Sequence, residues 1–276
     1  MSNLISVGAL REQLGASDMV VIDCRFNLME PEQGREMWQE AHIPGAHYAH
    51  LDDDLAGPVT PATGRHPLPD TAELAKTLGR WGISGGSKVV VYDDAGGAIA
   101  ARLWWLLRWL GHEDVQVLNG GWQAWQRVGE VSAEEPELRS GEYPGNPGQM
   151  PVLQAAAIQP GLEQGLCLID ARAAARFRGE VEPIDPVAGH VPGAINRDFA
   201  LNLDENGLFK SPEALKAEFA VLDGFAAGLA ACMCGSGVTA CHDILAAEEA
   251  GFPAPALYVG SWSGWIRDPA RPVATG

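Results

Sequence analysis

The sequence predicts an α/β protein made of two copies of one fold, each a mostly parallel sheet flanked by helices on both faces. Two observations predict this class. Residues 94–125 align without a gap with residues 234–265, at an offset of 140, and the alignment matches glycines and tryptophans. Each half also alternates short apolar runs with helical patterns, which is typical of parallel strands covered by helices. A repeat this long indicates a duplicated domain rather than a solenoid.

The first half carries the clearest strand and helix patterns. Residues 19–23 and 88–93 are β-branched runs bounded by turn residues, as buried parallel strands are. Residues 98–110 are apolar nearly all round and stop before Gly111, which predicts a buried helix with a glycine after its end. Residues 115–121 predict another strand that runs into a turn.

The two halves are separated by a stretch rich in proline, glycine and charge, residues 132–151, which predicts an exposed linker. We therefore expect one domain over residues 1–131 and a second over residues 152–276. In the second, residues 225–232 form an apolar run and residues 240–250 predict a helix. The loop 234–239, with the sequence CGSGVT, then lies at the carboxyl end of a strand, where α/β sheets bind ligands.

The chemistry of this loop favours a reactive thiolate at Cys234. A helix N-terminus supplies unpaired N–H groups and partial positive charge, and the two glycines allow successive amides to turn inward as an anion-binding nest. Such surroundings stabilise a thiolate, the form of cysteine that acts as a nucleophile. In the ungapped alignment Asp94 occupies the position of Cys234, and a carboxylate there cannot perform thiol chemistry. We therefore expect the first domain to be non-catalytic.

Composition limits the partners of the protein. The net charge of −17 and the pI near 4.7 disfavour nucleic acid and anionic membranes as partners. An anionic small substrate would need local arginines. The N-terminus lacks the features of a signal peptide, no apolar run approaches the roughly 20 residues of a membrane span, and the five cysteines are too uneven for a disulfide framework. We therefore expect the protein in the cytoplasm. The cysteine spacing fits a zinc site poorly.

Paired motifs connect the chain to a known family. Each half has a D-x-R strand end, within residues 20–25 and 166–172, and an H-[IV]-P-G-A segment, within residues 41–48 and 189–196. With these motifs the chain resembles the two-domain rhodanese-type sulfurtransferases. The CGSGVT loop is similar to that of the 3-mercaptopyruvate sulfurtransferases, whereas thiosulfate-preferring members carry a basic loop resembling CRKGVT.

The resemblance implies a mechanism without cofactor or metal. Cys234 would take sulfur from a small anionic donor as a persulfide and pass it to cyanide or to a thiol, either a small molecule or a thioredoxin-like protein, with ping-pong kinetics. The loop amides would stabilise the negative charge of the persulfide; they belong to Gly235, Gly237, Val238 and Thr239.

The resemblance also implies donor-binding residues. Ser236 would bind the donor's carbonyl or help protonate the departing enolate, and Arg176 would bind the donor's carboxylate. His66 and Asp54 would close the site and assist Ser236. Many mercaptopyruvate enzymes carry a second arginine in an E-P-R segment, where this chain has Ile184. Arg178 or Arg197 is expected to compensate.

Several alternatives stay open on the sequence alone. A thiosulfate sulfurtransferase shares every feature except the charge of the loop, and a non-catalytic sulfur-binding or sensor module would share the fold. A cysteine phosphatase is disfavoured because Ala240 stands where that chemistry needs arginine. Cys232 and Cys241 are predicted to be core residues, with a redox role as the alternative. The matched Asp-x-Arg pairs are predicted to hold the fold.

Overall fold

The computed structural model describes residues 2–139 and 141–276; residue 1 of the predicted first domain and residue 140 of the predicted linker lie outside this description. The chain divides into two compact units. The first unit contains residues 1–57, 68–149 and 205–208, and the second contains residues 58–67, 150–204 and 209–276. The segment 58–67, from the first half of the sequence, is therefore part of the second unit.

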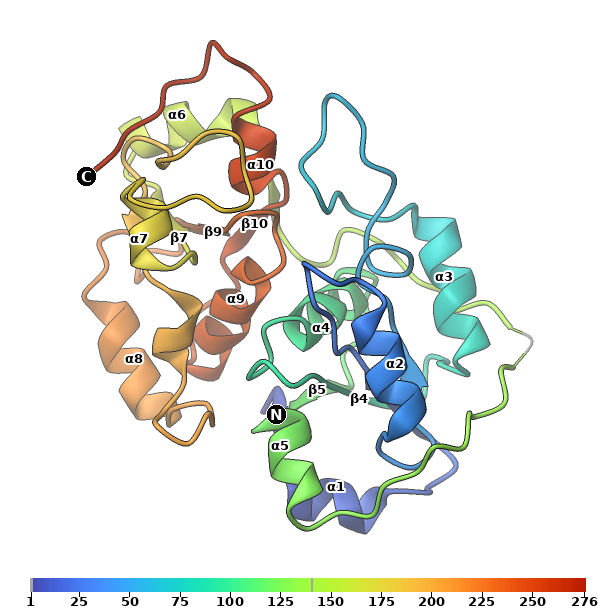
Figure 1. The fold of residues 1–276 in the computed structure, drawn as a ribbon. Helices are drawn as coiled ribbons and strands as arrows, with labels where there is room; N and C mark the ends of the chain where they lie inside the picture. Colours follow the sequence, from blue (N-terminus) through green and yellow to red (C-terminus); the bar gives the residue numbers. More distant parts are fainter. Residues whose placement is uncertain (1, 140) are drawn as a thin grey trace. The chain divides into compact units, whose positions relative to one another are not determined.

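Each unit contains one five-stranded parallel sheet (Figure 1), which confirms the predicted fold class. The strand orders are β1-β5-β4-β2-β3 and β6-β10-β9-β7-β8, so the two sheets have the same topology. The strands of the first unit are β1 (Leu4–Ile5), β2 (Met19–Asp23), β3 (His47–Tyr48), β4 (Lys88–Tyr92) and β5 (Val115–Leu118). Those of the second are β6 (Val152–Leu153), β7 (Cys167–Asp170), β8 (Ile195–Asn196), β9 (Ala230–Met233) and β10 (Ala256–Tyr258).

The helices follow the same repeat. The first unit has α1 (Val7–Gln13), α2 (Gln33–Glu40), α3 (Thr71–Arg80), α4 (Ala100–Trp109) and α5 (Gly121–Gln126). The second has α6 (Ala155–Glu163), α7 (Ala174–Phe177), a 3-10 turn η1 (Phe199–Asn202), α8 (Pro212–Ala220), α9 (Ala240–Glu249) and α10 (Ser261–Trp265). Gly111, which is predicted to follow the end of a helix, and Gly251, which follows α9, both adopt the left-handed conformation, with φ of 85° and 84°.

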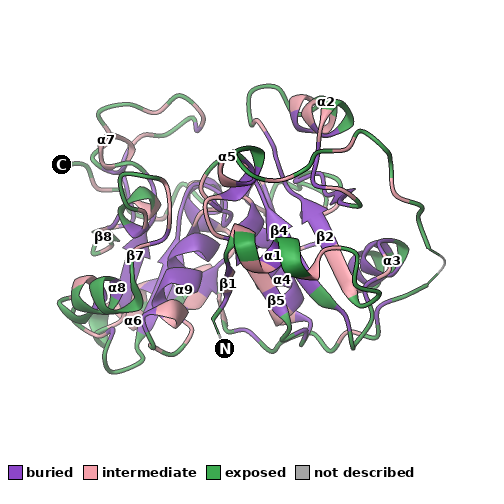
Figure 2. Cartoon of the chain, turned by 90° about the horizontal axis from the view of Figure 1, so that it is seen from below, coloured by how far each residue is buried: buried purple, intermediate pink, exposed green. Residues whose placement is uncertain are grey.

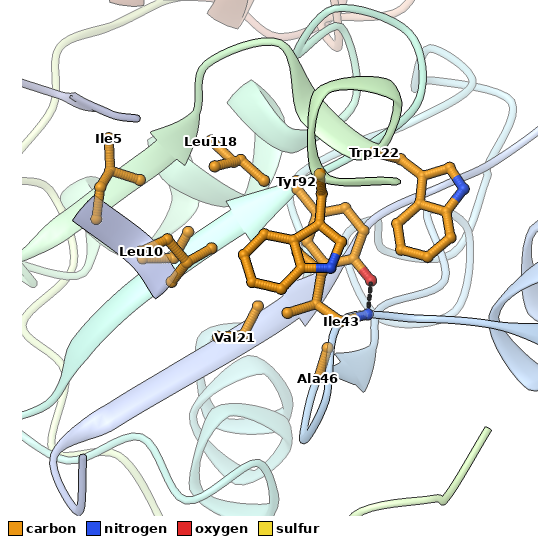
Figure 3. Close-up of a cluster of buried hydrophobic side chains, with 10 residues drawn as sticks. Ile5, Leu10, Val21, Ile43, Ala46, Tyr92, Leu118 and Trp122 are labelled. Carbon is orange, nitrogen blue, oxygen red and sulfur yellow. Dashed lines mark hydrogen bonds between the residues drawn. The ribbon is translucent and has the colours of Figure 1, made fainter. Parts of the chain in front are cut away.

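Alternation along the strands determines which helix covers each face of a sheet. In the first unit Val90 and Tyr92 of β4 pack with Leu10 of α1 and Trp122 of α5 in one buried cluster (Figure 3). The intervening valines of β4 point to the opposite face, and α4 packs against β4 and β5. In the second unit α6 and α10 cover one face, and α9 packs against β9 and β10. Figure 2 shows α9 buried along most of its length.

Each D-x-R motif forms a buried ion pair. The shortest contact is 2.6 Å between Arg25 and Asp23 and 2.7 Å between Arg172 and Asp170. Each arginine also donates to a main-chain carbonyl and lies over a tryptophan ring, Trp122 or Trp262. Because both units contain the same arrangement, the pairs hold the fold, as the sequence predicts.

Two predicted boundaries need correction. The apolar run 225–232 is not all strand: β9 starts at Ala230, and the preceding residues form turns. The described residues of the predicted linker 132–151 are mostly exposed, as expected, but up to residue 149 the segment belongs to the first unit. The amides of Tyr143 and Asn146 donate to main-chain carbonyls of Ala75 and Leu110, and the Tyr143 side chain is buried.

Candidate active site

The loop 234–239 connects β9 to α9 at the carboxyl end of the second sheet, where the sequence predicts it. Cys234 is the first residue after β9, and Thr239 is the N-cap of α9. Only 2% of Cys234 is exposed, and the amide of Gly237 donates to its Sγ at 3.1 Å. Gly237 has φ of 83°, and a β-carbon there would lie 2.7 Å from the Val259 carbonyl oxygen. Glycine is therefore required for the turn that directs this amide at the sulfur.

The first turn of α10 supports the loop through hydrogen bonds. The Ser261 hydroxyl donates to the Tyr258 carbonyl at 2.9 Å and accepts from the Cys234 amide at 3.1 Å. The amides of Trp262 and Ser263 donate to the carbonyls of Cys234 and Gly235, both at 2.9 Å. Ser261 has φ of 50°, and it is the one non-glycine residue of the described chain with positive φ. Such conformations cost free energy and are retained where function needs them.

The sequence interpretation missed Ser261, although comparing the two halves of the chain could have found it. At the ungapped offset the matching residue of the first unit is Gly121, whose φ is 53°. A serine at a position where the repeat has glycine indicates that the hydroxyl is needed there.

The segment 58–67 brings His66 to the catalytic loop. The His66 Nδ1 atom lies 2.7 Å from the Ser236 hydroxyl, and both residues are buried. Three contacts anchor the segment: the Arg65 amide donates to the Ser263 hydroxyl, Arg267 donates to the Thr63 carbonyl, and Gly64 approaches Gly260. A β-carbon on Gly64 would lie 2.5 Å from the Gly260 oxygen, so the close approach depends on glycine.

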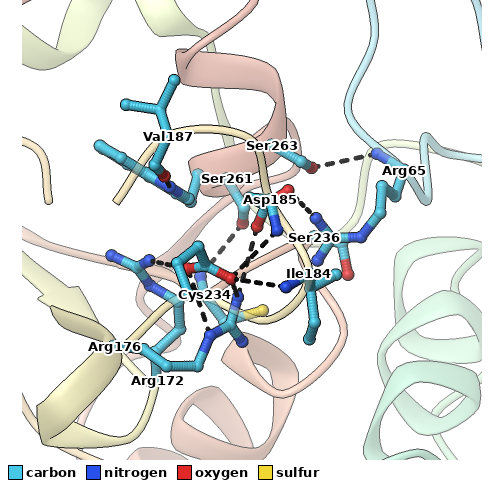
Figure 4. Close-up of polar contacts among 12 residues, drawn as sticks. Arg65, Arg172, Arg176, Ile184, Asp185, Val187, Cys234, Ser236, Ser261 and Ser263 are labelled. Atoms are coloured by element: carbon cyan, nitrogen blue, oxygen red, sulfur yellow. Dashed lines mark hydrogen bonds and ion pairs between the residues drawn. The ribbon is translucent and has the colours of Figure 1, made fainter. Parts of the chain in front are cut away.

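Two arginines flank Gly235, and both are held by carboxylates (Figure 4). Arg176 donates to Glu182 at 2.7 Å and contacts Asp185 at 3.3 Å, and Arg65 forms an ion pair with Asp185. The side chains of Glu182 and Asp185 are each 3% exposed. Burial raises the pKa of Asp185 even though both arginines oppose the shift. For Glu182, burial is outweighed by hydrogen bonds from Arg176 and from main-chain amides, so its pKa is lowered.

Arg65 is a second residue of this site that the sequence interpretation missed. Its partner Asp185 lies 120 residues away in the chain, so no local sequence pattern connects the two residues. The one available signal is that Arg65 directly precedes His66.

The other residues predicted to bind the donor have partners outside the loop 234–239. Arg178 is exposed and pairs with Glu180 at 2.8 Å. Arg197 is buried and held by Asn202, Asp243 and Glu218. Within residues 2–139 and 141–276 neither arginine forms a hydrogen bond or ion pair with the loop, so the geometry does not support the expected compensation for Ile184. Asp54 belongs to the first unit, where it accepts from the His50 amide at 2.8 Å.

The first unit has a carboxylate where the second has Cys234. Strand pairing matches Asp23 with Tyr92 and Asp170 with Met233, so Asp93, not Asp94, is the counterpart of Cys234. The correction arises because the first loop is one residue longer than the second. Asp93 accepts hydrogen bonds of 2.7–2.9 Å from four amides, those of Ala95, Gly97, Ile99 and Ala100. The first unit thus forms the nest and fills it with its own carboxylate.

The other cysteines differ from Cys234 in their surroundings. All five are free thiols. Burial raises the pKa of Cys24 and Cys232 well above the ordinary value, and that of Cys167 to about 11. The Cys241 Sγ donates to the Gly237 carbonyl at 3.4 Å, within the first turn of α9. These are the environments of packed thiols rather than nucleophiles.

The described residues contain neither a metal-binding cluster nor a membrane-spanning helix. Among the described residues no group of three or more His, Cys, Asp or Glu side chains could hold a metal ion. Within the same residues, no helix has both the length and the apolar character needed to cross a membrane.

Comparisons with known proteins agree with this fold. The family described as "Rhodanese-like domain" matches residues 6–128 and 154–268. The chain therefore belongs to the rhodanese-like family, and it is an enzyme of the sulfurtransferase class.

Individual relatives carry names for two sulfur donors. The chain is 52% identical to a Pseudomonas aeruginosa protein named "Probable 3-mercaptopyruvate sulfurtransferase", over 100% of this chain and 99% of the relative. It is 34% identical to the thiosulfate sulfurtransferase of Rattus norvegicus, over 90% and 84% of the two chains. The structure of the 3-mercaptopyruvate sulfotransferase SseA from Escherichia coli matches with a TM-score of 0.82 and 30% identity, over 95% of this chain and 100% of that one. Family membership alone therefore leaves the donor to be argued from the site.

Proposed function

We propose that this protein is a 3-mercaptopyruvate sulfurtransferase that carries the transferred sulfur as a persulfide on Cys234. The observation that carries the proposal is the hydrogen-bonded pair of His66 and Ser236 beside the nucleophile. A hydroxyl held by a buried histidine suits a donor that has a carbonyl group. Thiosulfate has none.

The first half-reaction balances without a cofactor. The Cys234 thiolate attacks the sulfur of 3-mercaptopyruvate, a sulfur–sulfur bond forms, and the carbon–sulfur bond breaks. The electron pair of the broken bond passes to carbon and gives the enolate of pyruvate. The thiol proton of the donor is transferred to that carbon, so the products are pyruvate and the Cys234 persulfide anion. The hydroxyl of Ser236, with His66 behind it, would stabilise the enolate oxygen and relay the proton.

The second half-reaction returns the enzyme to its starting state. An acceptor thiol attacks the outer sulfur of the persulfide, leaves as its own persulfide, and releases the Cys234 thiolate. Cyanide would leave as thiocyanate in the same way. The amide of Gly237, 3.1 Å from the Cys234 sulfur, would stabilise negative charge during the exchange. The acceptor in the cell is a thiol, either a small molecule or a thioredoxin-like protein, and the reaction needs a compartment that keeps Cys234 reduced, which we infer to be the cytoplasm.

Local charge supports mercaptopyruvate over thiosulfate. Arg65 and Arg176 provide two positive charges beside Gly235, and Glu182 and Asp185 balance them with two negative charges. A thiosulfate dianion would be better served by unbalanced positive charge. A single carboxylate needs only directed N–H groups, which arginine provides in a planar fork.

Two measurements test the proposal. Intact-mass analysis after incubation with 3-mercaptopyruvate should show the gain of one sulfur atom, mapped to Cys234. Steady-state assays with a common thiol acceptor should give a higher kcat/KM for 3-mercaptopyruvate than for thiosulfate. A kcat/KM for thiosulfate equal to or above that for mercaptopyruvate would replace the proposed donor by thiosulfate. Failure of both donors to load Cys234 would favour a non-catalytic module.

A further inference from the structure

An array of charged side chains runs along one side of the catalytic loop. Arg172 contacts Glu182 at 3.4 Å, Glu182 holds Arg176, and Asp185 contacts both Arg176 and Arg65. The carboxylate of Glu182 also accepts from the amides of Ile184 and Asp185, each at 3.1 Å. The segment with Ile184 therefore contributes its main chain and Asp185 to the array, where related enzymes are expected to contribute an arginine.

Arg65 and Arg176 each keep one guanidinium nitrogen directed at Gly235. A β-carbon on Gly235 would lie 2.9 Å from Nη2 of Arg65 and 3.6 Å from Nη1 of Arg176. Within residues 2–139 and 141–276 neither nitrogen has a hydrogen-bond acceptor, and the Nε atom of Arg65 is buried without a partner. The side chains are 22% and 18% exposed, so a small solute can reach them. Partly exposed guanidinium nitrogens that face the loop and have no protein acceptor are free to donate to a ligand that carries a carboxylate.

We propose that Arg65 is the second donor-binding arginine of this enzyme and determines its specificity for a carboxylate-bearing donor. Arg65 and Arg176 together bind the carboxylate of the α-keto acid. Arg65 thereby replaces the second arginine that related enzymes carry at the position of Ile184. This inference rests on the proposed function. Asp185 positions both guanidinium groups and cancels one of their charges, so that the site accepts a monoanion in preference to a dianion.

The contacts of the segment 58–67 allow the side chain of Arg65 to be tested apart from its main chain. The Arg65 amide is held by Ser263 whatever side chain residue 65 carries. Arg267 is exposed and holds the same segment through the Thr63 carbonyl, and within residues 2–139 and 141–276 it forms no hydrogen bond or ion pair with Gly235 or Asp185. Arg267→Gln is therefore a matched control for the holding of the segment, because it removes an arginine that anchors the segment but does not face Gly235.

The experiment compares two donors that differ only in the carboxylate. The donors are 3-mercaptopyruvate and mercaptoacetone, which keeps the carbonyl and the thiol but has a methyl group in place of the carboxylate. Arg65→Gln should raise KM for mercaptopyruvate about 10- to 100-fold, the range expected for a lost charge-assisted hydrogen bond, with kcat within about threefold. KM for mercaptoacetone should not change. Arg65→Lys should fall between, and Arg267→Gln should change KM for the two donors by the same factor.

A second arm tests the role of Asp185. Asp185→Asn leaves one arginine charge unbalanced, so the kcat/KM for thiosulfate should rise at least several-fold relative to that for mercaptopyruvate. An unchanged ratio would contradict the role of Asp185 in selecting a monoanion.

Three outcomes would overturn the proposal for Arg65. An unchanged KM for mercaptopyruvate in Arg65→Gln would show that its guanidinium does not bind the donor. Equal losses with both donors in Arg65→Gln would show that Arg65 only holds the segment. A loss in Arg267→Gln that is confined to mercaptopyruvate would show the same. Pyruvate inhibition separates this inference from the proposed function. If the wild-type enzyme prefers thiosulfate, the proposed donor is wrong. The carboxylate-binding role of Arg65 is then tested separately, because Arg65→Gln should weaken the inhibition of the thiosulfate reaction by pyruvate.

Discussion

The Nδ1 atom of His66 lies 2.7 Å from the hydroxyl of Ser236, across 170 positions of the sequence. The contact exists because the segment 58–67 is part of the second unit, in which its main chain is bound by the side chains of Ser263, within α10, and Arg267, just after α10. The histidine is therefore a component of the catalytic unit, although it comes from the half of the sequence without the nucleophile.

If this pair handles the carbonyl and the proton of the donor, its two members should act as one unit. We expect Ser236→Ala and His66→Asn each to lower kcat for mercaptopyruvate by about 100-fold, the lower range for general acid–base catalysis. The double variant should lose little more than either single variant, because each change disables the same relay. Thiosulfate turnover should fall much less in all three. Steady-state kinetics with both donors measures this, and fully additive losses would argue against a shared role.

Sulfur transfer should depend on one thiol. Cys234→Ser should abolish turnover and the sulfur adduct in intact-mass analysis, with near-normal unfolding in urea, because the hydroxyl is close in size to the thiol but a far weaker nucleophile. The control variants are Cys241→Ala and Cys232→Ala. They should keep most of the activity, since the first thiol is held by a carbonyl and the second is kept protonated by burial. Turnover that survives in Cys234→Ser would refute the mechanism.

The positive φ of Ser261 allows its strain to be separated from its hydrogen bond. Ser261→Ala keeps the unfavourable φ of 50° and removes the acceptor for the Cys234 amide, whereas Ser261→Gly removes the acceptor and relieves the strain. We expect both to lose stability, with the alanine variant about 1 kcal/mol less stable than the glycine variant. Urea unfolding of the two variants measures the difference. Equal stabilities would mean that strain at residue 261 is negligible.

Much of this architecture could be predicted from the sequence because the signals are local. The run 19–23 and the helix pattern 240–250 correspond closely to β2 and α9, and the loop 234–239 follows from them. The contact of His66 with Ser236 was expected only through the family resemblance, since no local pattern connects residues so far apart.

The errors have physical reasons of their own. The alignment of Asp94 with Cys234 is wrong because the helices align at an offset of 140 but the strand ends at an offset of 141. The extra residue lies in the loop between β4 and α4. Arg178 was grouped with Arg176 because they are close in sequence. Residues two apart on a helix point to different sides, and the short helix α7 turns Arg178 toward Glu180 instead.

Asp243, on α9, should make stability depend on pH. Its carboxylate is fully buried, accepts from Asn202 at 2.6 Å and contacts Arg197 at 3.3 Å, yet one of its oxygens has no partner. Burial raises its pKa from 3.8 to about 7, opposed by Arg197 and Asn202 and assisted by the negative charges of Asp198 and Asp170. Between pH 4 and pH 7 the folded protein therefore holds a proton at Asp243 that the unfolded chain has released.

The sign of the effect follows from this proton. Stability contributed by Asp243 is present at about pH 4 and is lost as pH rises to about 7, by an amount on the order of a few kcal/mol, and the loss is complete above that pH. Asp243→Asn mimics the protonated form, so the stability difference between the variant and wild type should move in favour of the variant as pH rises from 5 to 8. Urea unfolding at both values measures that difference, in which the contributions of other titrating groups cancel. A difference that stays constant, or that moves toward wild type, would show that Asp243 is ionised in the folded enzyme throughout this range.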